Sequence, residues 1–434
     1  MRILWICNIM LPAIAEKLHK EYSVREGWLT GVLNRMIESN GNNEVTLGIC
    51  FPYTDNDASF HETFEFTNHS KNAMSVECFG FAENLATPEK YDALLEKRFA
   101  QILDQFKPDM VHIFGTEFPH ALACAKAFHN PDRLLVGLQG IISKCAESYT
   151  ADLPDKIINR NTFRDILKKD GISMQQKKFF IRGEFEKETL CLAGNVTGRT
   201  EFDKSAVENI NKKAKYYFMN ETMRPVFYDD KWELAYCRKH RVFFSQADYP
   251  LKGFHYLLQA LPQILVRYPD AEIVVAGNSI VKNRTIKDKI KISGYGKYLR
   301  DYMNEWELNS KIEFLGTLTA EEMKEQYMLC HTLICASSLE NSPNSVAEAM
   351  LLGVPVIASK TGGIPSMIED GKDGILFEKG NSSELADAVI KLWSTDELCE
   401  QLSLEANKKA RETHNPQKNF ERLMEIYRQI VSNS

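Results

Sequence analysis

The feature that most constrains the fold is an alternation, along the whole chain, of short apolar runs with longer segments of helical period. The runs are rich in Val, Ile and Leu. This composition is typical of strands in parallel sheets, because helices cover both faces of such a sheet and bury its strands. This pattern predicts an α/β protein. We predict strands at residues 2–10, 45–51, 110–114, 134–138 and 194–197, and then at 241–245, 272–276, 311–315, 332–336, 355–358 and 375–377.

The alternation is interrupted once, by a polar and aromatic stretch at residues 220–239, and then restarts. Each half holds enough alternating units for its own doubly wound sheet, and 434 residues are enough for two domains of about 100–200 residues. We therefore predict two Rossmann-like domains, residues 1–225 and 226–414, that face a cleft. Ligands are expected at the carboxyl ends of the strands.

Composition narrows the class of protein further. Hydrophobic residues make up 44% and charged residues 26%, as in soluble globular enzymes, and the net charge of −6 does not call for a nucleic acid as partner. No apolar run approaches the ~18 residues of a membrane-spanning helix. The ten cysteines are scattered, without zinc-site spacing, which favours small buried thiols in a reducing compartment. We expect a cytoplasmic protein without a signal peptide.

The clearest candidate site follows the predicted strand 332–336. A loop that carries Glu340 leads into a predicted helix, whose first backbone N–H groups, at Asn344, Ser345 and Val346, can hold a phosphate without any cationic side chain. Glu348 lies about one turn into that helix, and carboxylates suit groups that are rich in hydroxyls. A second loop with glycines, at residues 361–363, follows the next strand. Two such neighbouring loops suit a sugar nucleotide.

These residues also carry a family resemblance. Residues 337–350 read SSLENSPNSVAEAM, and residues 353–359 and 362–363 read GVPVIAS and GG. The run resembles the signature of the family-4 retaining glycosyltransferases, which have the two-domain GT-B fold. The resemblance implies that the second domain binds the nucleotide sugar, that Glu340 contacts the donor sugar and that Glu348 contacts the ribose hydroxyls. It also implies that the last helix, 415–434, crosses back to the first domain.

The same resemblance makes Lys252 the cation for the donor diphosphate. Such enzymes usually carry an arginine five residues before this lysine, but this chain has Ala247 there. Because charge that develops on the leaving diphosphate must be stabilised, a substitute is needed. Our hypothesis is that Arg199, which follows the last strand of the first domain, reaches across the cleft.

In the first half, His120 lies at the entrance of a predicted helix after the strand 110–114. It resembles a family position that touches the donor sugar and assists at the reacting centre, although a lone histidine is often structural. Glu26, Gly27 and Trp28 open another helix and correspond to the family's loop on the acceptor side, without its usual pair of glycines.

Two further patterns, a D-x-D sequence and a basic segment, each have a functional and a structural interpretation. The D-x-D at residues 55–57 has the form of a metal-binding motif in other glycosyltransferases, but it lies far from the donor motif and is interpreted as a solvated turn. Residues 156–187 hold nine basic and four acidic residues. This segment is either a solvated insertion or a surface attracted to an anionic membrane on the inner face.

Together with the family resemblance, the sequence predicts a retaining, metal-independent glycosyltransferase of the hexosyl or N-acetylhexosaminyl type, without a cofactor. The donor is a nucleotide sugar, with UDP favoured over GDP, and the acceptor is a hydroxyl of a carbohydrate or a lipid-linked glycan, as in polysaccharide or glycolipid biosynthesis. Three alternatives stay open: a sugar-nucleotide epimerase, a phosphorylase of the same fold, and a non-catalytic protein that binds sugar nucleotides.

Overall fold

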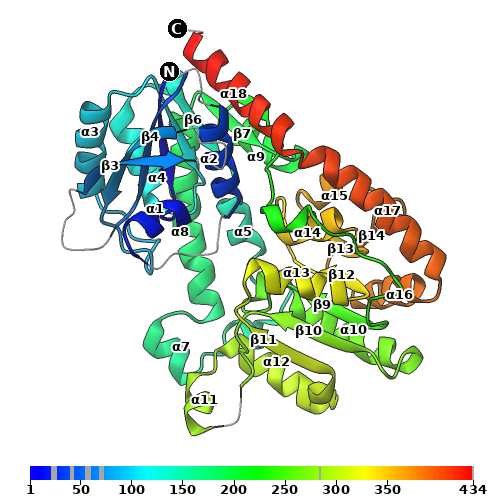
Figure 1. The fold of residues 1–434 in the computed structure, drawn as a ribbon. Helices are drawn as coiled ribbons and strands as arrows, with labels where there is room; N and C mark the ends of the chain where they lie inside the picture. The colour runs from blue at the N-terminus through cyan, green and yellow to red at the C-terminus, as the bar shows by residue number, and fades with distance from the viewer. Residues whose placement is uncertain (21–26, 40–43, 54–59, 68–72, 283–284, 433–434) are drawn as a thin grey trace. The chain divides into compact units, whose positions relative to one another are not determined.

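The computed structural model describes residues 1–20, 27–39, 44–53, 60–67, 73–282 and 285–432 (Figure 1). Its contacts divide the chain into two compact units. Unit 1 comprises Met1–Ser143, Lys178–Arg224 and His414–Ser434, and unit 2 comprises Lys144–Lys177 and Pro225–Thr413. The sequence had placed residues 144–177 in the first domain; in the structure they belong to unit 2.

Unit 1 is built on an eight-stranded sheet with the order β3-β4-β2-β1-β5-β6-β7-β8. Neighbouring strands are parallel except β3, which pairs antiparallel with β4. The bounds are β1 (Arg2–Cys7), β2 (Thr46–Pro52), β3 (His61–Thr67), β4 (Ala73–Phe81), β5 (Met110–Phe114), β6 (Leu134–Gly137), β7 (Asn195–Gly198) and β8 (Lys215–Phe218).

Five of these strands are predicted by the sequence, and three are not. Two of the missed strands, β3 and β8, are the edges of the sheet, and the third, β4, lies next to β3. β3 is largely exposed, so its sequence HETFEFT lacks the continuous apolar run of a buried parallel strand. The other edge strand, β8, has the sequence KYYF with one buried residue, so it also lacks such a run.

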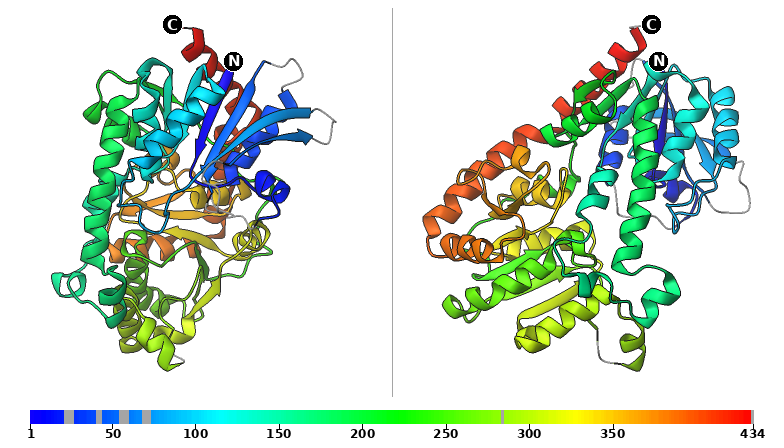
Figure 2. Two further views of the ribbon diagram at one scale, coloured as in Figure 1. Left: turned by 90° about the vertical axis from the view of Figure 1, so that its left-hand side faces the viewer. Right: turned by 180° about the vertical axis from the view of Figure 1, so that it is seen from behind.

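Helices cover both faces of this sheet (Figures 1 and 2). Successive residues of β1 alternate between two hydrophobic clusters: Ile3 and Trp5 belong to one, and Leu4 and Ile6 to the other. The first cluster includes Tyr427, whose hydroxyl accepts a hydrogen bond from Trp5 Nε1 at 3.0 Å. The helices of unit 1 are α1 (Pro12–Lys17), α2 (Gly27–Ser39), α3 (Leu94–Phe106), α4 (Pro119–Phe128), η2 (Pro131–Arg133), α9 (Glu201–Ile210) and α18 (Pro416–Ser432).

Unit 2 is built on a six-stranded parallel sheet with the order β11-β10-β9-β12-β13-β14. All six strands are predicted by the sequence, because each is a short apolar run. The bounds are β9 (Arg241–Phe244), β10 (Glu272–Ala276), β11 (Ile312–Gly316), β12 (Thr332–Cys335), β13 (Val356–Lys360) and β14 (Ile375–Glu378).

The helices of unit 2 include two from the segment 144–177 and the helices that connect the strands. They are α6 (Asp155–Ile158), α7 (Phe163–Lys168), η3 (Pro225–Phe227), η4 (Pro250–Lys252), α10 (Phe254–Arg267), α11 (Ile286–Lys291), α12 (Gly294–Glu305), η5 (Leu308–Lys311), α13 (Ala320–Leu329), α14 (Asn344–Leu352), α15 (Ile364–Met367), α16 (Ser382–Trp393) and α17 (Asp396–Thr413). Two helices, α5 (Ile142–Ser148) and α8 (Ile172–Leu192), cross a boundary between the units.

Each sheet has one point at which the strand order reverses. In unit 1 the chain builds outward from β1 through β2 and β4, and then continues with β5 on the other side of β1. In unit 2 it builds from β9 through β10 to β11, and then continues with β12 on the other side of β9. At such switch points the loops after the two central strands diverge and leave room for a ligand.

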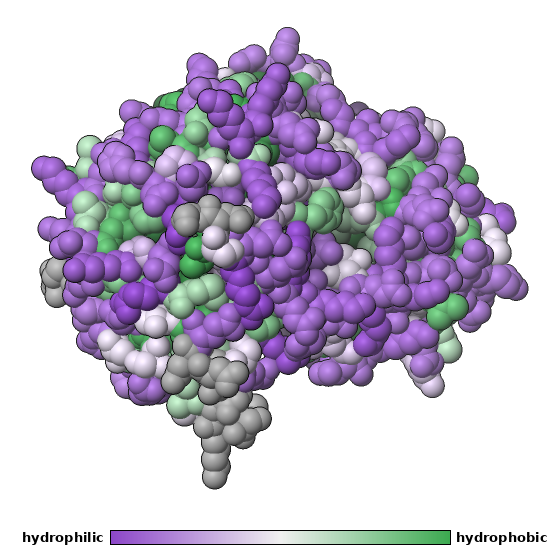
Figure 3. All heavy atoms as spheres, turned by 90° about the horizontal axis from the view of Figure 1, so that it is seen from above, coloured by the Kyte–Doolittle hydropathy of each residue, from purple (hydrophilic) through white to green (hydrophobic). Residues whose placement is uncertain are grey.

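In the described part of the chain, no helix is both long and apolar enough to cross a bilayer. Seen from the end at which the two termini lie, the surface is mainly hydrophilic, with apolar residues in small groups (Figure 3).

Candidate active site

The switch point of unit 2 holds an ion pair of two predicted site residues. Lys252 Nζ lies 2.7 Å from Glu340 Oε1, and the Ser337 hydroxyl donates to the same oxygen at 2.8 Å. The two charged side chains are 21% and 14% exposed, so the pair is within reach of a ligand. Burial alone would lower the pKa of Lys252, but the Glu340 carboxylate outweighs it and raises that pKa well above its ordinary value. The lysine is therefore a fixed positive charge at neutral pH.

A glycine brings Lys252 to this position. Gly253 has φ +69°, a left-handed conformation that favours glycine, and a Cβ there would collide with the carbonyl oxygen of Ala336 at the end of β12. The backbone N–H of Ser338 donates to the carbonyl of Leu251 at 2.8 Å. The loops after β9 and β12 are thus fastened together through the backbone, which sets the distance between lysine and glutamate.

The loop after β13 closes the other side of the glutamate. Gly362, at φ +51°, approaches the carbonyl oxygen of Glu340 so closely that a Cβ would collide with it. The backbone N–H of Gly363 donates to the same carbonyl at 2.9 Å, and the Thr361 hydroxyl donates to the carbonyl of Ser338 at 2.9 Å. The two neighbouring loops predicted from the sequence, at Glu340 and at residues 361–363, therefore lie against each other.

The start of α14 follows the loop that carries Glu340, and no side chain of the described residues caps it. Its N-cap is Pro343, with no side-chain hydrogen bond among the described residues and no acidic residue in the first turn. Val346 N–H donates to the carbonyl of Pro343 at 3.0 Å, so it is taken up by the helix itself. Within the described part of the chain, the N–H groups of Asn344 and Ser345 have no hydrogen-bond acceptor. These two amides and the helix dipole favour an anion here.

Other helices of unit 2 show the contrast. The helices α7, α11 and α13 each begin with a capping box, formed by Thr162 with Asp165, Thr285 with Asp288 and Thr319 with Glu322. An internal carboxylate supplies the negative charge at those helix starts. At α14 no side chain of the described residues does so.

Glu348 is placed differently from Glu340. It lies one turn into α14, is 4% exposed and accepts a hydrogen bond from the Tyr327 hydroxyl at 3.2 Å. Ala247, at the position of the usual arginine, is buried at 3% exposure and is followed by the exposed Asp248.

His120, in unit 1, lies at the switch point of the other sheet. It is the second residue of α4, as the sequence indicated, and its ring is fully buried. Nδ1 lies 2.6 Å from Glu83 Oε2, and Nε2 lies 3.0 Å from Asn8 Oδ1. The ring also stacks on Phe118, with centroids 5.7 Å apart. Both ring nitrogens thus face acceptors from unit 1.

Three residues around His120 were missed by the sequence. Glu83 also accepts from the backbone N–H of His120 at 3.0 Å, and Asn8 donates to Glu117 Oε2 at 3.1 Å. Glu117 Oε1 accepts from the backbone N–H of Gly140 at 3.1 Å. Glu83 follows the unpredicted strand β4, so no motif marked it; a polar Asn8 at the end of the buried strand β1 was the one available signal.

Arg199 is buried in unit 1 and paired there. Its guanidinium forms an ion pair with Glu221 and donates to the carbonyls of Leu138 at 3.1 Å and Gln139 at 3.0 Å. Its side chain is 6% exposed and that of Glu221 is 3% exposed. Burial raises the pKa of Glu221, while the Arg199 charge opposes that rise. In this arrangement the arginine is committed to partners in its own unit.

The remaining candidates carry less information. Gly27 and Trp28 are the first residues of α2, and Glu26 lies outside the described residues, as does the D-x-D at 55–57. Among the side chains that the structure describes, no group of three His, Cys, Asp or Glu is arranged to hold a metal ion.

Comparison with known proteins adds a sequence match for unit 2. Residues 230–409 match the family model described as glycosyl transferases group 1. Spore coat protein SA of Bacillus subtilis is 28% identical over 198 residues, which are 45% of this chain and 50% of that protein. The chain spans half or less of the length of the curated relatives it matches.

Solved structures match the whole chain in fold. Sucrose-phosphate synthase of Thermosynechococcus elongatus has a TM-score of 0.66 at 13% identity, with 100% of both chains covered. HepE of Anabaena, solved in complex with UDP-glucose, has a TM-score of 0.62 at 16% identity, with 99% of this chain and 100% of that chain covered. The predicted GT-B fold is confirmed.

Proposed function

We propose that this chain, whose residues 230–409 match the glycosyl transferases group 1 family model, transfers a sugar from a nucleoside-diphosphate sugar to a hydroxyl, with retention at the anomeric carbon. The observation that carries the proposal is the switch point of unit 2. There the Lys252–Glu340 pair adjoins the uncapped start of α14 and the loop at Gly362. A cation, two backbone amides and a carboxylate suit a diphosphate joined to a sugar.

In this mechanism unit 2 stabilises the leaving group. The bond between the anomeric carbon and the phosphate oxygen breaks, and negative charge develops on the nucleoside diphosphate. Lys252 and the N–H groups of Asn344 and Ser345 are fixed before the reaction, so they stabilise this charge without reorganising. Glu340 accepts hydrogen bonds from sugar hydroxyls, and Glu348 is assigned to the ribose.

The acceptor oxygen then forms the new bond on the face that the phosphate leaves. Its proton passes to the departing phosphate oxygen, so no separate carboxylate base is required, unlike the paired carboxylates of glycoside hydrolases. The transition state resembles an oxocarbenium ion, and attack on the same face gives retention. His120 and the start of α2, at Glu26, Gly27 and Trp28, are assigned to the sugar and acceptor side.

The finer assignments are a hexosyl or N-acetylhexosaminyl donor, with UDP favoured over GDP, since HepE was solved with UDP-glucose. We assign the acceptor to carbohydrates or lipid-linked glycans, and the enzyme to the cytoplasmic face of a membrane as a peripheral protein. Arg199 is proposed as a structural residue, because it is buried and paired with Glu221.

The test is turnover of a panel of UDP- and GDP-sugars with sugar acceptors, with the anomeric configuration of the product read by NMR. The expected result is transfer of one donor with retention, lost in Lys252→Ala. Conversion of the donor with no acceptor present would indicate an epimerase instead, and a requirement for inorganic phosphate would indicate a phosphorylase. Nucleotide binding with no turnover on any acceptor would leave a binding protein.

A further inference from the structure

Large exposed apolar side chains gather on two short helices of unit 2. Phe163, Ile166 and Leu167 of α7 are 70%, 65% and 73% exposed, and Ile290 of α11 is 52% exposed. Positions i, i+3 and i+4 share one face of a helix, and α11 contacts α7. We call these four residues the α7–α11 apolar face. Single exposed apolar residues are common on soluble proteins, but a gathered group marks an interaction surface.

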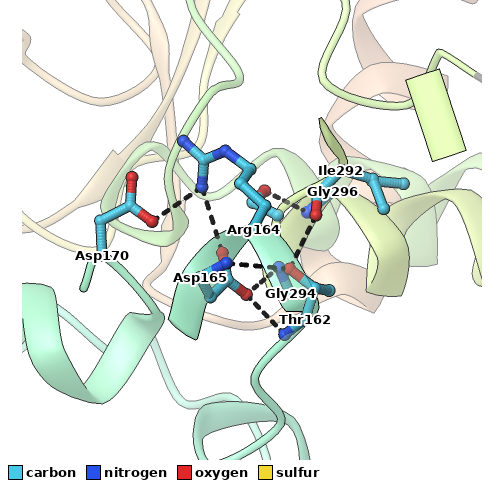
Figure 4. A network of polar contacts seen from close by, with 8 residues as sticks. Thr162, Arg164, Asp165, Asp170, Ile292, Gly294 and Gly296 are labelled. Carbon is cyan, nitrogen blue, oxygen red and sulfur yellow. Dashed lines mark hydrogen bonds and ion pairs between the residues drawn. The ribbon is translucent and has the colours of Figure 1, made fainter. Parts of the chain in front are cut away.

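This face is held in place by buried polar contacts (Figure 4). Asp165, whose side chain is fully buried, accepts from the backbone N–H of Gly294 at 2.7 Å and from that of Thr162 at 3.0 Å. The Thr162 hydroxyl donates to the carbonyl of Ile292 at 2.8 Å, and Arg164 pairs with both Asp165 and Asp170. These bonds hold α7 against the residues between α11 and α12 and the start of α12. The position of the exposed apolar residues is therefore fixed by buried hydrogen bonds.

The charge beside the face is positive. Residues 156–170 and 290–301 hold eight Lys or Arg and three Asp, in a chain whose net charge is −6. Lys168 and Lys169 follow at the end of α7 and Lys291 ends α11, and all three are exposed. Two of the three aspartates, Asp165 and Asp170, are paired with Arg164. Exposed apolar side chains with lysines beside them are typical of surfaces that bind anionic bilayers.

An open cavity of about 820 Å³ adjoins the same residues. Phe163 and Ile290 line it together with Arg160, Lys297 and Arg300. Asp301 also lines it and pairs with Arg160 and Arg300, at 3.3 and 3.6 Å. A cavity with apolar and cationic walls suits a phosphate that carries acyl chains.

We propose that the α7–α11 apolar face docks unit 2 on an anionic lipid bilayer. The four side chains of this face enter the bilayer interface. The exposed lysines lie against the headgroups, and the cavity binds a headgroup phosphate. The proposal deepens the peripheral location proposed above and names its surface. It rests on that location and not on the transfer reaction, so the two are tested separately.

The experiment is flotation of the full chain with vesicles of phosphatidylcholine alone and of phosphatidylcholine mixed with phosphatidylglycerol. Binding is expected only to the anionic vesicles and should weaken as salt is added. Phe163→Ser/Leu167→Ser, and separately Lys168→Ala/Lys169→Ala, should each reduce the partition coefficient by about tenfold or more. Turnover with a soluble acceptor should stay at the wild-type level in both variants.

Matched controls replace exposed apolar residues by serine, and exposed lysines by alanine, elsewhere on unit 2. Val266 and Leu404 are 86% and 55% exposed, and Lys379 and Lys391 are exposed. Val266→Ser/Leu404→Ser and Lys379→Ala/Lys391→Ala should bind vesicles as the wild type does. Equal binding to neutral and anionic vesicles, no binding, or equal loss in the control variants would overturn the proposal. A dimer in solution that Phe163→Ser/Leu167→Ser dissociates would assign the face to a second copy of the chain instead.

Discussion

The two switch points have the same topology, but the side chains at one are buried and hydrogen-bonded to each other, while those at the other are partly exposed. In unit 1, His120 is fully buried, with its ring nitrogens facing Glu83 and Asn8. In unit 2, Lys252 and Glu340 stay partly exposed beside a helix start that none of the described side chains caps. The comparison teaches that strand order decides where a site can lie, while the local side chains decide whether it is a closed polar network or an open anion site. Four predictions test this difference.

The largest effect is expected for the buried ion pair of unit 1. Arg199→Met leaves Glu221 as an unpaired buried carboxylate and should lower the free energy of unfolding by about 3–5 kcal/mol. Urea denaturation measures it. The double variant Arg199→Met/Glu221→Leu removes both charges and should recover most of the loss. If Arg199→Met kept its stability but lost turnover, the arginine would be a donor-site cation after all.

The next effect belongs to the open site of unit 2. Lys252→Ala removes the fixed charge beside the leaving diphosphate, and turnover should fall by about 10²–10³-fold, as for loss of one preorganised donor. Steady-state kinetics with the preferred donor measure it. Lys360→Ala is the control, because Lys360 is 57% exposed and pairs with Glu378 on the surface. A turnover loss below tenfold in Lys252→Ala would contradict the assigned role.

A smaller effect is expected at the closed network of unit 1. Glu83→Ala removes the acceptor of both the ring and the backbone N–H of His120, and should cost about 1–3 kcal/mol of stability. Glu83→Gln keeps one acceptor oxygen and should cost less, and the exposed Glu62→Ala should cost almost nothing. Nucleotide affinity should be unchanged in all three. A selective loss of nucleotide affinity in Glu83→Ala would place the donor site in unit 1.

The smallest effect concerns pH and compares one histidine from each unit. Burial lowers the pKa of His414 in unit 1 and of His255 in unit 2 to about 4, against about 6.5 in an unfolded chain. Between these values the unfolded state binds the extra proton, so stability falls as the pH falls, by about 1.4 kcal/mol per pH unit for each histidine.

His414→Asn and His255→Asn should each flatten this slope, as measured by urea denaturation at pH 7 and pH 5. If both substitutions reduce the pH dependence of stability equally, the two units hold a buried histidine neutral in the same way, and their difference lies only at the switch points. An unchanged slope in both variants would show that these histidines are not held neutral.

The sequence predicted unit 2 better than unit 1, and the reason is physical. Strands buried on both faces appear as apolar runs, whereas the edge strands β3 and β8 keep polar residues in solvent. Lys252 and Glu340 were predicted as candidates because their loops follow such strands and match the family motif, and the structure places them in one ion pair. Glu83, Glu221 and the membership of residues 144–177 in unit 2 depend on contacts between distant parts of the chain, which no local pattern records.

The most direct test of the central claim is calorimetric titration of UDP and GDP into the wild type, Lys252→Ala and Glu83→Gln. The account predicts that one of the two nucleotides binds the wild type, that its Kd rises at least about tenfold in Lys252→Ala because a charge-assisted contact is lost, and that Glu83→Gln binds it as the wild type does. An equal Kd in the wild type and Lys252→Ala, or no binding of either nucleotide, would contradict a donor site at the switch point of unit 2.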